Sequence, residues 1–268
     1  MERFGVSPRR SFGQNFVVDP NTVRRIARLS GAGPADRVLE IGAGLGSLTL
    51  ALAETGAAVR AVEVDSGLAA ALREVVAEAG AHRVEVVEGD AAALDFDDVL
   101  EGSDRWMLVA NLPYNIATGL VVDLLHDAAA ISVMVVMVQR EVGERLVAPP
   151  GSRARGIPSV LVERQGTARV VAKVPASVFR PRPRVESVVV KIERHPGAQA
   201  VSLPPASEAR FKRLVRAGFG QRRKMLRRSL AGLVTSEGFA AAGVDPASRP
   251  EVLTLDQWIN LARTETQE

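Results

Sequence analysis

Three closely spaced glycines form the first segment of the chain whose residue types suggest ligand chemistry. They are Gly42, Gly44 and Gly46, in a G-x-G-x-G spacing directly after an apolar run. Glycines let the backbone turn tightly and approach a ligand closely. The dinucleotide-binding turn G-x-G-x-x-G would need a glycine at position 47, where the chain has Ser47. The spacing therefore favours a ligand that presents a carboxylate and an ammonium to the following helix over one that presents a pyrophosphate.

Acidic residues end the next two apolar runs of the chain. Glu63 follows Gly42 at roughly the 20-residue distance at which an acid accepts hydrogen bonds from ribose hydroxyls in nucleotide-binding sheets. Asp65 is the weaker candidate for that role, and Asp90 could accept a hydrogen bond from an adenine amine. The alternative for each acid is helix capping or plain solvation. Together with the glycine turn, these acids predict S-adenosylmethionine as the cofactor.

The segment Asn-Leu-Pro-Tyr-Asn at 111–115 follows a fourth apolar run. It is expected to face the same pocket, because ligands bind beyond the carboxyl ends of parallel strands. The Asn111 side-chain oxygen and the Leu112 carbonyl could accept the two protons of an exocyclic amine. Such acceptors orient a weak nucleophile and stabilise the positive charge that develops on it. Tyr114, the only tyrosine, could stack on a base, although Asn and Pro also form ordinary turns.

Alternating β-branched runs and helical stretches predict the framework that positions these residues. Repeated strand–helix units indicate an α/β protein with a mostly parallel sheet. The apolar run 131–138 suits a central strand that is buried on both faces. Strands are expected at 37–41, 59–64, 84–88, 107–110, 131–138, 168–174 and 185–192.

The C-terminal part of the chain has only helical patterns. The proline-rich segment 195–205 is typical of a linker. Helices are expected beyond it at 208–219, 221–233, around Phe239 and at 255–263. We therefore expect two domains, a catalytic domain with an N-terminal arm at 1–195 and a small all-helical domain at 206–268.

Composition excludes several classes of site. The chain has no cysteine, so it forms neither disulfides nor thiolate metal sites. Its three histidines, His82, His126 and His195, are too scattered to suggest a metal cluster. No run of 18 apolar residues occurs, and the first residues carry no apolar signal core. We therefore expect a cytoplasmic protein with no metal ion and no membrane span.

Basic residues concentrate in the C-terminal part. Residues 196–268 hold 11 Lys and Arg against 7 Asp and Glu. Nine of these basic residues lie between Arg210 and Arg228, a stretch that contains no acid. Like charges on one helix repel each other, so phosphates that neutralise them would explain the arrangement. A solvated basic helix face is the alternative.

Six motifs, spread in order over nearly the whole chain, are typical of one enzyme family. They are SFGQNFVVD at 11–19, EIGAGLG at 40–46, VEVD at 62–65, NLPYNIAT at 111–118, FRPRPRVES at 179–187 and FGQRRK at 219–224. In combination they resemble the bacterial 16S rRNA adenine N6-dimethyltransferases. Two departures are mild, since Val17 replaces the usual leucine and Ala117 the usual serine.

The resemblance implies a fold, a reaction and a set of site residues. The fold is a seven-stranded Rossmann-like methyltransferase sheet with a helical, RNA-binding C-terminal domain. The reaction is dimethylation at N6 of two adjacent adenosines in the 3′-terminal hairpin loop of 16S rRNA, within the small ribosomal subunit or its precursor.

S-adenosylmethionine would contact Asn15, Val17, Gly42, Gly44, Glu63, Asp90 and Asn111. The target base would be held by Asn111, Leu112, Tyr114 and, on its other face, Phe179. RNA would contact Arg180, Arg182, Arg184, Arg222, Arg223 and Lys224, and the enzyme is expected to act as a monomer.

Two alternatives remain open from the sequence. The 23S rRNA adenine methyltransferases of macrolide resistance share the site at 111–114, although the QRRK segment at 221–224 favours the small-subunit enzyme. A ribosome-assembly factor that acts mainly by binding is the second alternative.

Overall fold

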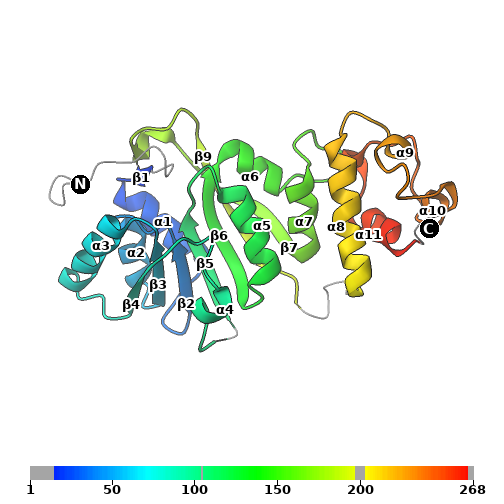
Figure 1. Ribbon diagram of the computed structural model, residues 1–268. Helices are drawn as coiled ribbons and strands as arrows, with labels where there is room; N and C mark the ends of the chain where they lie inside the picture. Colours follow the sequence, from blue (N-terminus) through cyan, green and yellow to red (C-terminus); the bar gives the residue numbers. More distant parts are fainter. Residues whose placement is uncertain (1–14, 104, 197–202, 265–268) are drawn as a thin grey trace. The chain divides into compact units, whose positions relative to one another are not determined.

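The computed structural model describes residues 15–103, 105–196 and 203–264. The basic arm at 1–14, most of the predicted linker and residues 265–268 lie outside the described residues. The chain forms two compact units (Figure 1). One unit comprises residues 1–143 and 167–194, and the other comprises residues 144–166 and 195–268.

The first unit is built on a seven-stranded sheet with the order β4-β3-β2-β5-β6-β9-β7. Strands β2 to β6 pair in parallel, whereas β9 runs antiparallel to β6. This arrangement confirms the predicted α/β methyltransferase sheet. The strands are β2 Arg37–Ile41, β3 Ala58–Glu63, β4 Val84–Glu88, β5 Trp106–Asn111, β6 Ile131–Gln139, β7 Gly166–Val174 and β9 Ser187–Arg194.

A second, two-stranded sheet joins distant parts of this unit. Strand β1 (Phe16–Val17) pairs antiparallel with β8 (Phe179–Arg180). Phe16 lies opposite Arg180 and Val17 lies opposite Phe179. The pairing brings the N-terminal motif against the segment that carries the predicted RNA contacts at 180–184.

Local signals in the sequence explain where the helices of this unit begin and end. The Asp19 carboxylate caps α1 by accepting hydrogen bonds from the Asn21 and Thr22 amides. Gly31 ends the same helix with a left-handed φ of 76°. The Asp65 carboxylate caps α3 by accepting hydrogen bonds from the Gly67 and Leu68 amides. This contact confirms helix capping, the alternative to a ligand-binding role, for Asp65. The helices are α1 Pro20–Ser30, α2 Ser47–Ala53, α3 Ser66–Glu78, α4 Phe96–Val99, α5 Ala117–Asp127 and α6 Arg140–Leu146.

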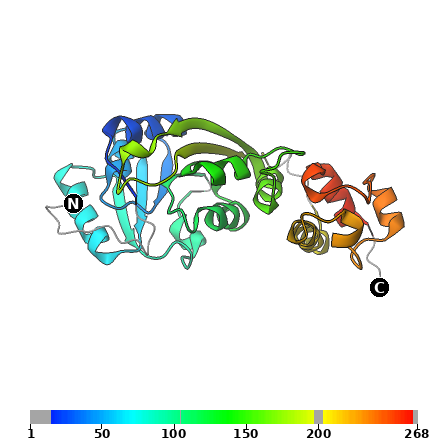
Figure 2. The same cartoon turned by 90° about the horizontal axis from the view of Figure 1, so that it is seen from above.

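Helices cover both faces of the sheet (Figure 2). Helices α1, α2 and α3 share one apolar core with alternate strand residues such as Val38, Val109 and Val135. The intervening residue Leu108 is fully buried as well, and so is Val121 of α5. Strands buried on both faces are typical of parallel sheets, and here they hold the carboxyl edge of the sheet rigidly.

The second unit packs helices around one apolar core. Trp258, Phe211 and Phe239 are its largest buried members. Thr254 caps the last helix with a reciprocal bond to Gln257. The helices are α7 Ile157–Gln165, α8 Pro205–Gly220, α9 Leu226–Ser229, α10 Ser236–Ala241 and α11 Leu255–Arg263. None of the helices in the described ranges combines the length and apolarity that crossing a bilayer requires.

The predicted helix at 221–233 is wrong. Residues 221–224 form a turn, and only Leu226–Ser229 is helical. The cause is tertiary, because the amides of Leu226 and Arg227 bond to the carbonyls of Ser248 (2.8 Å) and Pro246 (2.9 Å). The basic residues of this stretch therefore lie on a turn and a short helix, and not along one helix face.

Contacts divide the chain differently from the predicted boundary at 195, because residues 144–166 join the C-terminal helices. Val160 of α7 is fully buried in the helical core. The buried Arg155 guanidinium donates to the carbonyls of Ala148 (2.9 Å) and Leu253 (3.2 Å) and to Glu163 (2.7 Å). These contacts make the helical unit larger than the predicted domain 206–268.

Candidate active site

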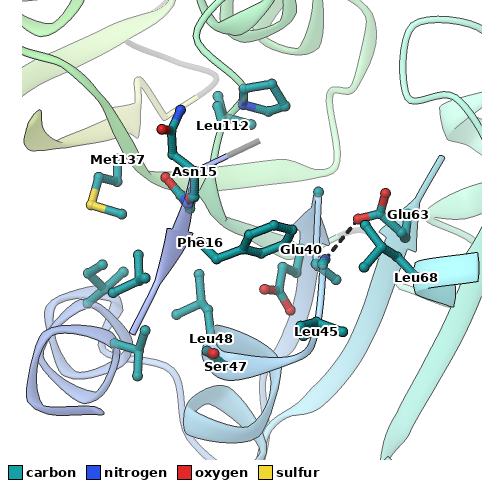
Figure 3. A pocket seen from close by; sticks show the side chains of 18 of the residues that line it. Asn15, Phe16, Glu40, Leu45, Ser47, Leu48, Glu63, Leu68, Leu112 and Met137 are labelled. Atoms are coloured by element: carbon teal, nitrogen blue, oxygen red, sulfur yellow. Dashed lines mark hydrogen bonds between the residues drawn. The ribbon is translucent and has the colours of Figure 1, made fainter. Parts of the chain in front are cut away.

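A pocket opens at the carboxyl edge of the sheet, where the strand order reverses between β2 and β5 (Figure 3). This reversal is the usual ligand site of doubly wound sheets. Its walls come from the turn after β2, the end of β3, the segment after β5, helix α1 and strand β1. The predicted site residues that line it are Asn15, Val17, Gly42, Gly44, Glu63, Asn111, Leu112 and Tyr114.

The glycine turn forms the floor of the pocket. Gly42, Gly44 and Gly46 have φ values of 74°, 58° and 85°, which favour glycine. At Gly44 a Cβ would lie 2.9 Å from the Phe16 ring, so a side chain there would displace that ring. Figure 3 shows the Phe16 ring pointing into the pocket, and sequence reasoning missed this residue.

Glu63 fastens the glycine turn to the end of β3. Its carboxylate is 4% exposed and accepts hydrogen bonds from the Gly44 amide (2.8 Å, dashed in Figure 3) and the Asp65 amide (3.0 Å). Each carboxylate oxygen can accept more than one hydrogen bond. Glu63 can therefore hold the turn and bind ligand hydroxyls at the same time.

Glu40, the last but one residue of β2, is a second pocket carboxylate that sequence reasoning missed. It is 2% exposed, and its Oε2 has no hydrogen-bond partner among the described residues. Burial raises the pKa of Glu40 to about 8; the nearby Thr49 hydroxyl lowers it and the negative charge of Glu63 raises it further. Its position two residues before Gly42, the first glycine of the turn, was the available signal.

These features fit the predicted cofactor. A glycine turn that admits no side chain lets an extended ligand lie against the backbone. The unpartnered oxygen of Glu40 is suited to an ammonium group, and Glu63 is suited to ribose hydroxyls. S-adenosylmethionine carries both groups. In the described residues no three His, Asp or Glu side chains gather as a metal site would require.

The segment after β5 lies against the glycine turn, as expected. A Cβ on Gly42 would lie 3.6 Å from the Pro113 ring. The side-chain nitrogen of Asn111 (Nδ2) donates to the Asn15 backbone carbonyl (3.0 Å). The side-chain oxygen of Asn111 is therefore the atom that can accept a hydrogen bond from a ligand. The Leu112 amide donates to the Met137 carbonyl (3.1 Å), which fixes the orientation of this segment.

Tyr114 is half-buried at the pocket wall. Its hydroxyl lies 3.0 Å from the Ser187 hydroxyl, at the first residue of β9. Burial raises the pKa of the Tyr114 phenol, and the bond to Ser187 lowers it by a smaller amount. The ring is therefore neutral at physiological pH and remains suited to stacking.

Two predicted site residues lie outside the pocket lining. Asp90 is exposed, which agrees with the solvation alternative, and its carboxylate accepts from the Ala92 amide (2.9 Å) in a local turn. Phe179 is 1% exposed and packs in the core beside Val17. Its ring is enclosed by that core, so the structure does not present it to a base.

The predicted RNA contacts differ in their surroundings. Arg180, Arg182 and Arg184 are exposed on the first unit. In the second unit Arg223 and Lys224 are exposed, whereas Arg222 donates to the Arg153 carbonyl (2.6 Å) and pairs with Glu251 (3.7 Å). The structure therefore gives Arg222 an intramolecular role within its own unit.

Comparison with known proteins decides the family. Residues 5–267 match the family Ribosomal RNA adenine dimethylase. The chain belongs to this family. It is accordingly an S-adenosylmethionine-dependent methyltransferase of ribosomal RNA, and the predicted cofactor and enzyme class are confirmed.

Relatives whose sequences match nearly the whole chain have a more specific name. The chain is 44% identical to the ribosomal RNA small subunit methyltransferase A of Bifidobacterium adolescentis, over 97% of this chain and 89% of the relative. The protein of that name from Acidothermus cellulolyticus is 45% identical, over 97% and 89%. These relatives confirm the predicted small-subunit rRNA adenine dimethyltransferase, and the 23S rRNA alternative is not favoured.

Solved structures share the fold. The 23S rRNA methyltransferase ErmE is 26% identical and aligns with a TM-score of 0.71 over 92% of this chain and 98% of its own. A dimethyladenosine transferase from Plasmodium falciparum is 22% identical and aligns with a TM-score of 0.75 over 92% and 95%. The same fold thus occurs in a 23S rRNA methyltransferase and in a dimethyladenosine transferase.

Proposed function

We propose that the protein transfers methyl groups to N6 of two adjacent adenosines in the 3′-terminal hairpin loop of 16S rRNA. The observation that carries this function is the contact of the Asn111–Tyr114 segment with the glycine turn, which puts amine acceptors beside the cofactor site. The names of the full-length relatives support the small subunit as the substrate. The enzyme acts as a monomer in the cytoplasm on the subunit or its precursor.

The residues of the chain bind and orient both reactants. The glycine turn, Glu63 and Glu40 hold S-adenosylmethionine, which supplies an electrophilic methyl group when bound. The Asn111 side-chain oxygen and the Leu112 carbonyl accept the protons of the adenine amine and aim its nitrogen at that methyl group. Both acceptors would also stabilise the positive charge that appears on nitrogen as the N–C bond forms and the bond between the methyl group and sulfur breaks, its electron pair staying on sulfur.

No residue needs to remove a proton before the transfer. Once the nitrogen carries positive charge it is acidic, and its proton leaves toward the acceptors and then to solvent. Tyr114 supports the ring of the base by stacking, which holds the amine in register with the acceptors. An unpaired adenosine is the favoured substrate, because removing a paired base from its helix costs free energy.

The exposed arginines supply substrate affinity. Arg180 is the last residue of β8, and Arg182 and Arg184 follow it. All three are exposed, so their charges are available to phosphates. Phosphate contacts position an RNA without reading its sequence, so the choice of adenosine is left to the pocket.

Mass spectrometry of rRNA nucleosides tests the proposal. Undermethylated small and large subunits are incubated separately with the protein and S-adenosylmethionine, and the modified nucleosides are mapped. We expect dimethyladenosine at two adjacent positions of 16S rRNA and none in 23S rRNA. Modification of 23S rRNA instead would refute the proposed substrate while leaving the enzyme class intact.

A further inference from the structure

A fully buried serine touches the side chain that we assign to base stacking. Ser187 is 0% exposed, and its hydroxyl lies 3.0 Å from the Tyr114 hydroxyl. The two residues are 73 positions apart in the chain, so the contact is a product of the fold. A buried hydroxyl needs a hydrogen-bond partner, and the phenol supplies it.

The sheet determines where Ser187 lies. It pairs with Gln139, the last residue of β6, in the antiparallel register of β6 and β9. The neighbouring Arg140 amide donates to the Glu186 carbonyl (3.0 Å), which fixes the entry of the chain into β9. The serine hydroxyl is therefore held by the rigid sheet, and the tyrosine is the partner that could move.

A hydrogen bond at the phenol restrains the whole ring. The hydroxyl lies at the end of the ring farthest from the backbone, so a bond there prevents the side chain from swinging about χ1. A stacking ring that keeps its position before the base arrives loses less conformational entropy when the base binds. Preorganisation of this kind favours the reactive geometry over other bound geometries.

We propose that Ser187 is a positioning residue for the target adenine, which it serves by holding the Tyr114 ring in its stacking position. This inference rests on the proposed function of Tyr114. Ser187 is not among the residues that line the pocket, and its hydroxyl contacts the Tyr114 hydroxyl, so its effect passes through that hydrogen bond. Ser187, the first residue of β9, follows three positions after Arg184, so a short segment links the exposed arginines at 180–184 to the partner of the Tyr114 hydroxyl.

The first experiment measures the hydrogen bond without RNA. Tyr114 is the only tyrosine, so protein made with 3-fluorotyrosine gives one fluorine resonance, from a phenol that is more acidic than tyrosine's. We expect the Ser187→Ala variant to titrate at higher pH than the parent, because the bond favours the ionised phenol. Ser30→Ala removes another buried serine hydroxyl, whose bond to the Ala27 carbonyl is local, and should leave the resonance unchanged.

The second experiment is a double-mutant cycle on single-turnover methyl transfer. Tyr114→Phe and Ser187→Ala each remove the same hydrogen bond, so each should slow transfer about two- to tenfold. The double variant should be no slower than the slower single variant. RNA retention should be unchanged in all three, and Ser187→Thr, which keeps a hydroxyl, should restore much of the rate.

The outcomes separate this inference from the proposed function. An unchanged titration and rate in Ser187→Ala, or single effects that multiply in the double variant, would overturn the role of Ser187. If Ser187→Ala fails to fold, Tyr114→Phe tests the same bond without altering the buried strand, and an unchanged transfer rate in it would overturn the role. Full turnover by Tyr114→Ala would instead overturn the stacking site itself.

Discussion

Arg222 and its neighbours Arg223 and Lys224 should behave differently when each is changed to Gln. The three residues are adjacent in the sequence. Among the residues that the structure describes, the Arg222 side chain is the one of the three with a hydrogen bond and an ion pair, to the Arg153 carbonyl and to Glu251. Arg223 and Lys224 are exposed. We expect the Arg223→Gln and Lys224→Gln changes to weaken RNA binding, and the Arg222→Gln change to lower the stability of the protein.

The magnitudes follow from these surroundings. Each phosphate contact contributes ~0.7 to ~0.9 to the slope of log affinity against log salt, so the Arg223→Gln/Lys224→Gln pair should flatten the slope by about 1.4 to 1.8. Arg222→Gln removes a hydrogen bond and leaves Glu251, whose side chain is 19% exposed, without its cation. That loss should cost about 1–2 kcal/mol, and each kcal/mol lowers the Tm of a small unit by about 4–8 °C.

Two assays distinguish the variants. Filter binding of small subunits at several salt concentrations gives the slope, and thermal unfolding gives the Tm. Adenosylmethionine affinity, measured by titration calorimetry, serves as the control and should be unchanged in all variants. A parental salt slope in the Arg223→Gln/Lys224→Gln pair would show that these cations are merely solvated. A parental Tm in Arg222→Gln would refute its intramolecular role.

Two predictions concern the cofactor pocket. Glu63→Ala should weaken S-adenosylmethionine binding by ~1.5–3 kcal/mol, because it removes ribose acceptors and frees the Gly44 amide; unchanged affinity in calorimetry would make Glu63 purely structural. The native pKa of Glu40, about 8, lies above its ordinary value of 4.5, so the stability that this group contributes is fully present below pH 4.5 and is lost as the pH rises through 8. The unfolding free energy of the Glu40→Gln variant, measured by urea titration, should therefore rise relative to that of the parent between pH 5 and pH 9. A difference between the two proteins that stays constant with pH would contradict a buried, protonated Glu40 carboxyl.

Local patterns predicted the elements that position the site. The strands 37–41 and 84–88 were predicted with the bounds that they have, because their β-branched runs end at glycine or acidic residues. The placement of Glu63 followed from the spacing rule of nucleotide-binding sheets. Signals of this kind depend on a few neighbouring residues, and so they can be recognised without the fold.

Tertiary contacts decided what the sequence could not show. The helix expected at 221–233 is replaced by a turn, because the carbonyls of 246 and 248 bind the amides of Leu226 and Arg227. Burial of Phe179 depends on its pairing with β1, across more than 160 residues of chain. Ser187 and Phe16 escaped notice because their partners, Tyr114 and Gly44, lie on other elements and are not neighbours in the sequence.

The most direct test of the account is the Asn111→Ala variant on undermethylated small subunits. Transfer is measured as dimethyladenosine mapped in 16S rRNA, with subunit retention and S-adenosylmethionine affinity measured on the same samples. Removing one preorganised charge-stabilising group typically costs 10²–10³ in rate, so we expect a loss of about a hundredfold or more, with retention nearly unchanged. Near-parental transfer by Asn111→Ala would contradict the claim that the segment after β5 presents the adenine amine.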